Sequence, residues 1–419
     1  MYRLIHSFLL FAGIALSVHL AYAQGYLDKG VKFEDHLSWP AIKVRAMAEN
    51  KYILVDCFAT WCGPCRYMSG SVFSLQTAGD FFNPRFINVR IQMDTTANDE
   101  PAVKRWYADA RMIKTRYGVN AYPTFLIFAP NGRILHKIVG GTNTAREFIT
   151  IVRSAFDTTK QYYTQLIQFF GGRRDSGFLR RLAYQCLDSY DMQNGLKVFQ
   201  AWQPTQSSPY TPVGLDLLAR YTRQTTDPGF ELFLHHSAEA DEIMGVGKAE
   251  RLVNITLLRE YVQPQLQDFN PAGPNWAAVQ QPLESKYPAQ AAEVIALSKA
   301  LYYEHEKDWP NFQTAVVAYM QKYGAHASVE QLNSFAFTVF SYCPDMNCVT
   351  EALEWSRRSF KDKPVAGYMD TYANILYKMG KKGEAIAWEE KARDAAGHYD
   401  RPGYQATLDR MKKGEKTWD

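Results

Sequence analysis

A short apolar segment, YILVDCFA at residues 52–59, leads directly into the motif WCGPC at residues 61–65. A continuous apolar run of this length is typical of a strand that is buried on both faces of a sheet. Proline is well tolerated just inside a helix start, because its missing N–H would have no partner there. Together these features predict a central strand that turns into a helix at the first cysteine of the motif.

Two cysteines that flank Gly63 and Pro64 allow three chemistries: half of a zinc site, a structural disulfide, or a thiol pair that exchanges electrons. Zinc requires a second close pair of Cys or His ligands, and the nearest histidines, His36 and His136, lack this spacing. A small disulfide ring that closes on a helix start is strained and reducible, which disfavours a purely structural bond. Electron exchange is therefore the favoured hypothesis, with Cys62 above backbone N–H groups that favour its thiolate.

Helical and strand patterns alternate as far as Phe156. We expect helices at 33–50, from Cys65 onward, at 100–117 and at 145–156, and strands at 52–59, 86–93, 124–128 and 133–139. Asn131-Gly132 predicts a hairpin turn between the last two strands. The order of elements predicts an α/β sheet that ends in an antiparallel hairpin.

The segment from about Phe33 to Phe156 resembles the thioredoxin family. The resemblance depends on four features in order: Asp56 six residues before Cys62, WCGPC, Tyr122-Pro123-Thr124, and Gly140-Gly141. Arg90 stands where the family often has a lysine near the buried acid. The stretch 96–99, the spacing of Met68 and Phe73, and the long helix before Tyr117 are similar to the C-terminal periplasmic domain of DsbD-type proteins.

This resemblance implies an α/β thioredoxin fold and a role for each residue of the site. Cys62 would attack a client disulfide, Cys65 would resolve the mixed disulfide, and Asp56 would take the Cys65 proton. The alternative for Asp56 is a hydrogen-bonded core acid without a proton role. Pro123 would be a cis-proline that faces the cysteines, although an ordinary trans proline is the alternative from the residues alone. The substrate groove would include Trp61, Gly63, Pro64, Tyr122 and Gly140. The redox group would be the Cys62–Cys65 disulfide itself, without a separate cofactor or metal.

Residues 1–23 have the pattern of a cleaved signal peptide. Arg3 provides a positive start, residues 7–20 are apolar, and Ala21-Tyr22-Ala23 is a cleavage site. A membrane anchor is the less favoured alternative, because the apolar run is shorter than the ~20 residues that a spanning helix needs. We expect a mature chain from Gln24 that is exported, with the periplasm as its compartment and without stable membrane insertion.

Length and charge restrict the partners and the domain count. The chain of 419 residues exceeds a typical single domain, and we expect a thioredoxin-like domain at 24–156 followed by a helical domain at 157–419. The net charge of +4 and the lack of a Lys/Arg cluster argue against nucleic acid as a partner.

The second domain is expected to be all-α and repetitive. Segments 178–202, 332–360 and 368–392 align, with Ala183 on Ala373 and Gly195 on Ala385. They resemble tetratricopeptide repeats, most closely at 368–396, while residues 205–287 fit no repeat. Such a domain would bind partners on a concave face. The alternative is a helical domain that only packs against the thioredoxin-like domain.

The four cysteines outside the motif are expected to have structural roles. Cys57 and Cys186 fall in apolar patterns and are expected to be small core residues. Cys343 and Cys348 flank a loop that is longer than in the other repeats. In an exported protein they are expected to form a local disulfide, with two reduced thiols as the alternative.

Together, these features predict an exported thiol-disulfide oxidoreductase with a partner-binding helical domain and disulfide-bearing client proteins. Gly-Pro between the cysteines is typical of the reducing end of the family, near about −270 mV for thioredoxin against about −120 mV for DsbA. A reductase or repair role is therefore favoured, supplied by a membrane reductant of the DsbD type. The alternatives are a binding scaffold with incidental thiols, an oxidase or isomerase of disulfides, and a peroxide-handling or maturation factor for one client.

Overall fold

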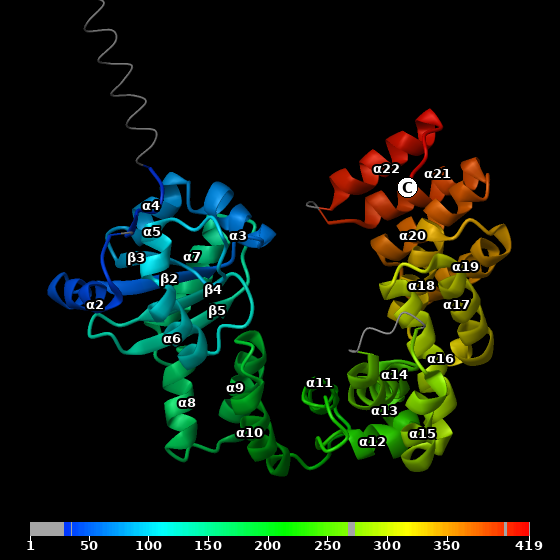
Figure 1. The fold of residues 1–419 in the computed structure, drawn as a ribbon, viewed down its shortest axis with the longest axis horizontal. Helices are drawn as coiled ribbons and strands as arrows, with labels where there is room; N and C mark the ends of the chain where they lie inside the picture. Colours follow the sequence, from blue (N-terminus) through cyan, green and yellow to red (C-terminus); the bar gives the residue numbers. More distant parts are fainter. Residues whose placement is uncertain (1–28, 35, 267–272, 398–399, 419) are drawn as a thin grey trace, which may run out of the picture. The chain divides into compact units, whose positions relative to one another are not determined.

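The computed structural model describes residues 29–34, 36–266, 273–397 and 400–418 (Figure 1). The predicted signal peptide at 1–23 lies outside these residues. The chain divides into two compact units, one ending at Ser207 and the other beginning at Ser208. Within the described ranges, no helix combines the length and hydropathy of a membrane span.

A five-stranded sheet with the order β1-β3-β2-β4-β5 forms the centre of the first unit (Figure 1). The strands are β1 (Phe33–Glu34), β2 (Tyr52–Phe58), β3 (Phe86–Gln92), β4 (Thr124–Phe128) and β5 (Ile134–Val139). Strands β1, β3 and β2 are parallel, whereas β4 is antiparallel to both β2 and β5. The predicted α/β sheet with a terminal antiparallel hairpin is therefore confirmed.

Two apolar layers pack on opposite faces of this sheet, and they follow the alternation of side chains along β2. Ile53 and Val55 face a layer that contains α2 and α6, while Leu54 faces a layer that contains η1, α4 and α7. The helices of this region are α2 (Trp39–Ala48), α3 (Gly63–Tyr67), the π-helix η1 (Met68–Val72), α4 (Gln76–Phe82), α5 (Pro101–Arg105), α6 (Tyr107–Tyr117), α7 (Ala145–Arg153) and the 3₁₀-helix η2 (Ser154–Phe156).

Two of the predicted helices differ from the structure. Phe33 and Glu34 form β1 and pair with β3, so the helix expected at 33–50 begins only at Trp39. The helix expected at 100–117 is divided at Trp106, which ends α5 and precedes α6. The first difference arises because pairing with a distant strand decides the conformation of β1, and a local pattern does not contain that information.

The first unit continues beyond the sheet through α8 (Tyr162–Phe170), α9 (Ser176–Asp188), α10 (Met192–Trp202) and η3 (Gln203–Thr205). The backbone N–H of Tyr162 donates to Nδ1 of His136 in β5 at 3.0 Å, and the Tyr162 hydroxyl donates to Asp191 at 2.6 Å. Burial lowers the pKa of His136 to about 4, so its ring is neutral near pH 7 and Nδ1 accepts. The predicted boundary at 156 coincides with the end of η2, but the compact unit extends to Ser207.

The second unit is helical throughout its described part. Its α-helices are α11 (Pro212–Arg220), α12 (Phe230–His235), α13 (Ser237–Met244), α14 (Lys248–Leu257), α15 (Trp276–Lys286), α16 (Pro288–His305), α17 (Trp309–Tyr323), α18 (Val329–Tyr342), α19 (Met346–Ser359), α20 (Ala366–Lys378), α21 (Lys382–Ala395) and α22 (Arg401–Lys413). Shorter helical turns are η4 (Leu258–Val262), η5 (Gln263–Leu266) and η6 (Gly324–His326).

One turn recurs in three helix pairs, α9–α10, α16–α17 and α20–α21. Its central residue is left-handed, with φ of 53° at Tyr190, 56° at Lys307 and 80° at Gly380. In each case the next N–H donates to the carbonyl five residues earlier, at 2.9 to 3.0 Å. This is the hydrogen bond that closes a Schellman-type helix end. The same bond also follows α2, α6, α8 and α22, so it is a common helix end in this chain. The aligned Ala183 and Ala373 are both buried.

We predict that residues 24–207 form a more stable fragment than residues 24–156. The shorter fragment lacks Tyr162 and Leu166, which are buried in the structure. Its free energy of unfolding should be lower by at least about 2 kcal/mol, because the apolar surface that Tyr162 and Leu166 cover would be exposed to water. Urea unfolding of the two fragments measures the difference, and equal midpoints and slopes would contradict the prediction.

Candidate active site

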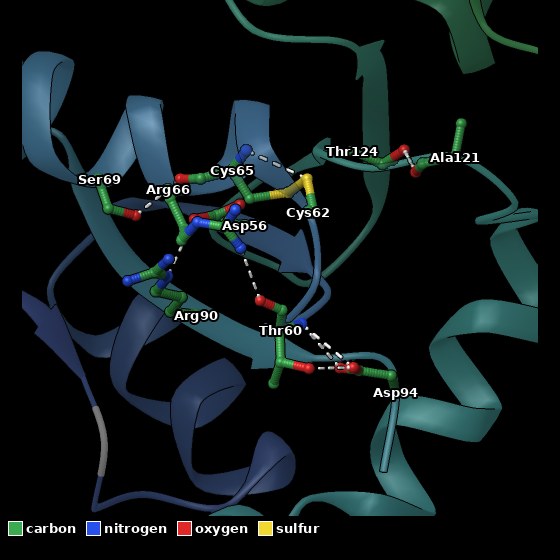
Figure 2. The surroundings of a disulfide bond; sticks show 10 residues. All are labelled: Asp56, Thr60, Cys62, Cys65, Arg66, Ser69, Arg90, Asp94, Ala121 and Thr124. Atoms are coloured by element: carbon green, nitrogen blue, oxygen red, sulfur yellow. Dashed lines mark hydrogen bonds and ion pairs between the residues drawn. A yellow bond between two sulfur atoms is a disulfide. The ribbon is translucent and has the colours of Figure 1, made fainter. Parts of the chain in front are cut away.

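Cys62 and Cys65 form a disulfide at the point where β2 leads into α3 (Figure 2). Cys62 is the N-cap of α3, and its Sγ accepts a hydrogen bond of 3.1 Å from the backbone N–H of Cys65. The first N–H groups of a helix lack partners within the helix, so they are available to stabilise negative charge on this sulfur. The predicted position of Cys62 at a helix start is therefore confirmed.

The two sulfur-bearing residues are buried, but their neighbours in the motif are exposed. Cys62 and Cys65 are 3% and 2% exposed, so neither is more accessible than the other in the disulfide form. Trp61 is 69% exposed and lies edge-on to Tyr122, with the ring centroids 5.8 Å apart. Tyr122 also packs against the two cysteines. A partner chain would meet this aromatic pair before it reaches the sulfurs.

The loop before the motif is held by Asp94, a residue that was not predicted from the sequence. The backbone N–H and the hydroxyl of Thr60 both donate to the Asp94 carboxylate (Figure 2). The Arg66 guanidinium donates to the Thr60 carbonyl at 3.1 Å. Asp94 lies just after β3, the parallel neighbour of β2. An acid at the carboxyl end of a buried strand was the only available signal.

Asp56 lies in β2, beneath the helix that begins at the motif (Figure 2). Leu54 and Phe58 share its face of the strand. Leu54 belongs to the same apolar cluster as Met68, and Phe58 packs against the cluster that holds the two cysteines. Arg90 Nε is 3.3 Å from one carboxylate oxygen, which confirms the predicted neighbour. The other oxygen, Oδ1, has no hydrogen-bond partner within the described part of the chain.

Burial raises the pKa of Asp56 to about 7, although the positive charge of Arg90 opposes this rise. A carboxyl with such a pKa exists in both protonation states near neutrality. It can therefore accept a proton and release it again in the same pH range. The raised pKa and the unpartnered Oδ1 distinguish Asp56 from a fully paired core acid.

The loops that carry Pro123 and the two glycines are joined beside the motif. The Tyr122–Pro123 bond is cis, as predicted, and the N–H of Gly140 donates to the Pro123 carbonyl at 2.8 Å. Gly140 has a φ of 93°, which favours glycine. A Cβ on Gly141 would lie 2.9 Å from Cγ of Met68, so close packing requires glycine there as well.

Cys57 and Cys186 are free and fully buried, which confirms their prediction as core residues. Burial raises the pKa of Cys57 well above its ordinary value and raises the pKa of Cys186 to about 12. Cys57 lies on the face of β2 opposite to Asp56. Neither thiol forms a reactive thiolate near neutral pH.

Cys343 and Cys348 are also free and buried, so the predicted disulfide between them is wrong for this structure. Cys343 caps the end of α18, and Cys348 lies in the first turn of α19. A hydrogen bond from the Cys348 thiol lowers the pKa of Cys343 and raises the pKa of Cys348. The prediction used spacing and compartment alone, whereas two buried thiols pack stably as small apolar residues. Among the described residues, no group of three His, Cys, Asp or Glu side chains could hold a metal ion.

Residues 40–156 match a family model described as a thioredoxin-like domain. Thioredoxin Asp f 29 of Aspergillus fumigatus is 30% identical over 95 residues, which are 23% of this chain and 71% of that protein. Thioredoxin-like protein 1 of Schizosaccharomyces pombe is 30% identical over 112 residues, 26% of this chain and 33% of that protein. Thioredoxin Y, chloroplastic, of Oryza sativa subsp. japonica is 33% identical over 111 residues, 26% of this chain and 55% of that protein.

The chain thus spans between a third and about half of the length of the last two relatives. Among solved structures, it is similar to a proposed disulphide-isomerase from Bacteroides thetaiotaomicron, with 32% identity and a TM-score of 0.26. That match covers 31% of this chain and 96% of the other.

We predict that Asp56→Asn changes how stability depends on pH. The folded-state pKa of about 7 lies above the ordinary value of 3.8, so the folded protein binds more protons than the unfolded chain between these values. Wild-type stability should therefore fall, relative to the variant, as pH rises from about 4 to about 7. The total difference should be on the order of 3 kcal/mol.

Urea unfolding of wild type and variant between pH 4 and pH 8 measures this difference. The opposite contribution of His136, whose pKa is lowered to about 4, is present in both proteins and cancels. A difference that stays constant over this range would show that Asp56 ionises with an ordinary pKa.

We also predict that four thiols are alkylated when oxidised protein is denatured without a reductant. Cys57, Cys186, Cys343 and Cys348 should each carry one label, because only Cys62 and Cys65 are paired. Mass spectrometry counts and locates the labels. Only two labels, with Cys343 and Cys348 linked, would instead support the disulfide that was expected from the sequence.

Proposed function

The chain belongs to the thioredoxin family through residues 40–156, and we propose that it is a thiol-disulfide oxidoreductase acting on disulfides of client proteins. The observation that carries this proposal is the Cys62–Cys65 disulfide at a helix start, above a buried carboxyl. The exposed Trp61 and Tyr122 pair is the surface on which a client would rest.

The reaction begins with the reduced pair. The Cys62 thiolate, stabilised by the N–H of Cys65, attacks one sulfur of the client disulfide. The client S–S bond breaks, a Cys62–client disulfide forms, and the other client sulfur leaves as a thiolate that takes a proton. The Cys65 thiolate then attacks Cys62 and releases the second client sulfur. The client gains two electrons, and the Cys62–Cys65 disulfide is restored.

Asp56 is proposed as the base that deprotonates Cys65 for the second step. It lies beneath the helix that carries Cys65, and its pKa of about 7 is well placed for proton transfer near neutral pH. The proposed proton acceptor is the carboxylate oxygen Oδ1, which has no hydrogen-bond partner among the described residues, because Arg90 lies at the other oxygen. Proton transfer takes place directly or through one water molecule.

We propose that the physiological direction is reduction or repair of disulfides outside the cytoplasm. The support is Gly63-Pro64 between the cysteines, the pair typical of reducing family members, and the signal-like sequence at 1–23. In an oxidising compartment the pair needs a continuous supply of electrons. A membrane reductant of the DsbD type is the proposed donor, on the basis of the sequence resemblance around Thr96 to Asp99.

The helical hairpins are proposed to form a tetratricopeptide-like domain that binds partner proteins. The alignment of Ala183 with Ala373, both of them buried, supports a repeated unit, as does the buried Ala385 in the last hairpin. Stacked helical hairpins provide an extended binding surface, and tethering such a surface to a redox unit raises the local concentration of clients.

We predict a reducing potential for the Cys62–Cys65 pair. Equilibration with glutathione or dithiothreitol should give a value closer to about −270 mV than to about −120 mV. The protein should also accelerate insulin reduction by dithiothreitol, and Cys62→Ser should abolish this acceleration. A potential near about −120 mV would contradict the reductase proposal and favour an oxidase.

We predict that Asp56→Asn slows release of the client more than its capture. Near pH 7, resolution of the mixed disulfide should slow by about 10²-fold or more, because the Cys65 thiol loses its base. Rapid-quench kinetics with a single-disulfide peptide separate the two steps. The rate of resolution in the variant should rise with pH as hydroxide replaces the base. Equal resolution rates at pH 6 to 8 would mean that Asp56 has no proton role.

A further inference from the structure

A groove of about 620 Å³ crosses the surface of the second unit. Its floor is formed by α14 and η4. The end of α11, the residues after it and the start of α18 form its walls. We propose that this groove binds an acidic segment of a partner protein. The inference deepens the partner-binding role proposed above for the helical region, and it does not depend on the redox chemistry.

One face of the helix formed by α14 and η4 supplies the floor of the groove. Lys248, Arg251, Leu252, Ile255 and Arg259 line it, and their spacing of three and four residues places them on the same side of a helix. Cationic side chains therefore stand at both ends of this face, and the two apolar side chains lie between them.

The positive charge of the groove is only partly neutralised. Lys248 pairs with Glu330 at 3.3 Å, and Arg220 pairs with Asp216 at 2.9 Å. Arg223, Arg251 and Arg259 form no ion pair with a carboxylate among the described residues, and Glu330 is the only acid that lines the groove. Three guanidinium groups along the groove that form no ion pair attract an anionic partner, and they lose that attraction at high salt.

The dimensions favour a peptide over a small anion. From Lys248 to Arg259 the helix rises by roughly 16 Å, at 1.5 Å per residue. An extended peptide spans that distance with about five residues. A single phosphate would reach only one end. The apolar floor at Leu252 and Ile255 would face water beneath a phosphate chain, whereas it fits an apolar side chain between two acidic residues.

Nucleic acid fits the groove less well than such a peptide. Proteins that bind single strands stack bases on aromatic side chains, and none of the residues that line this groove is aromatic. The expected ligand is therefore an extended peptide segment in which acidic residues flank one or two apolar residues.

Fluorescence anisotropy of the full chain tests this assignment. The probe is a labelled peptide in which two pairs of glutamates flank two leucines. Arg223→Glu/Arg259→Glu should weaken its binding by at least about tenfold, since reversed charges repel the ligand. Arg251→Gln should weaken binding at the other end of the groove. The matched control is Lys381→Glu/Lys382→Glu, which changes the net charge equally in exposed residues outside the groove and should bind like the wild type.

Comparison probes decide the class of ligand. A peptide with glutamines in place of the glutamates should bind more weakly, and so should a peptide with serines in place of the leucines. An oligothymidine or polyphosphate of equal charge that binds as tightly would overturn the peptide assignment. Peptide binding that is unchanged in the Arg223/Arg259 variant, or absent in the wild type, would overturn the groove itself.

Insulin reduction by each variant provides an independent check. It should stay at the wild-type rate, because the groove lies in the second unit and the disulfide in the first. Active protein without peptide binding would refute the groove and leave the oxidoreductase proposal standing. Peptide binding by a protein that does not reduce insulin would refute the oxidoreductase proposal and leave the groove proposal standing. Circular dichroism and the milder Arg223→Gln/Arg259→Gln variant separate loss of binding from loss of fold.

Discussion

The ionisable carboxyl of Asp56 in the central strand is the constraint around which the first unit is arranged. A charge in this position is costly because neighbouring layers exclude water, and one arginine at 3.3 Å offsets only part of the cost. A fully paired acid would have a depressed pKa and would hold no proton near neutrality. The partial pairing leaves the pKa of this carboxyl at about 7, and apolar side chains pack on both faces of β2 around it.

Sequence patterns predicted the features that depend on local chemistry. The strands at 52–58 and 124–128 were visible as continuous apolar runs, and the helix start at Cys62 followed from proline and free N–H groups. The partnership of Asp56 with Arg90 also came from the sequence, because family resemblance places a cation near that acid. Residue type and immediate neighbours decide the strands and the helix start, whereas the Asp56–Arg90 pair joins two strands and was expected only from the resemblance.

Most of the missed features depend on contacts between distant residues. Residues 33–34 form strand β1 because they pair with the edge of β3. Asp94 holds the loop before the motif because it follows β3 and accepts a hydrogen bond from Thr60. The helices after 156 join the first unit through contacts such as the one between His136 and Tyr162. Cys343 and Cys348 illustrate a different limit. Their spacing suited a disulfide, but in the structure both are buried free thiols, and the Cys348 thiol donates a hydrogen bond to Cys343.

The inert thiols of the first unit have a consequence for stoichiometry. Cys57 and Cys186 are buried with raised pKa values, so among the described cysteines of this unit only Cys62 and Cys65 are suited to exchange. The unit therefore stores one pair of electrons, without an internal reserve. In the proposed reaction, one molecule therefore reduces one disulfide before its own pair must be reduced again.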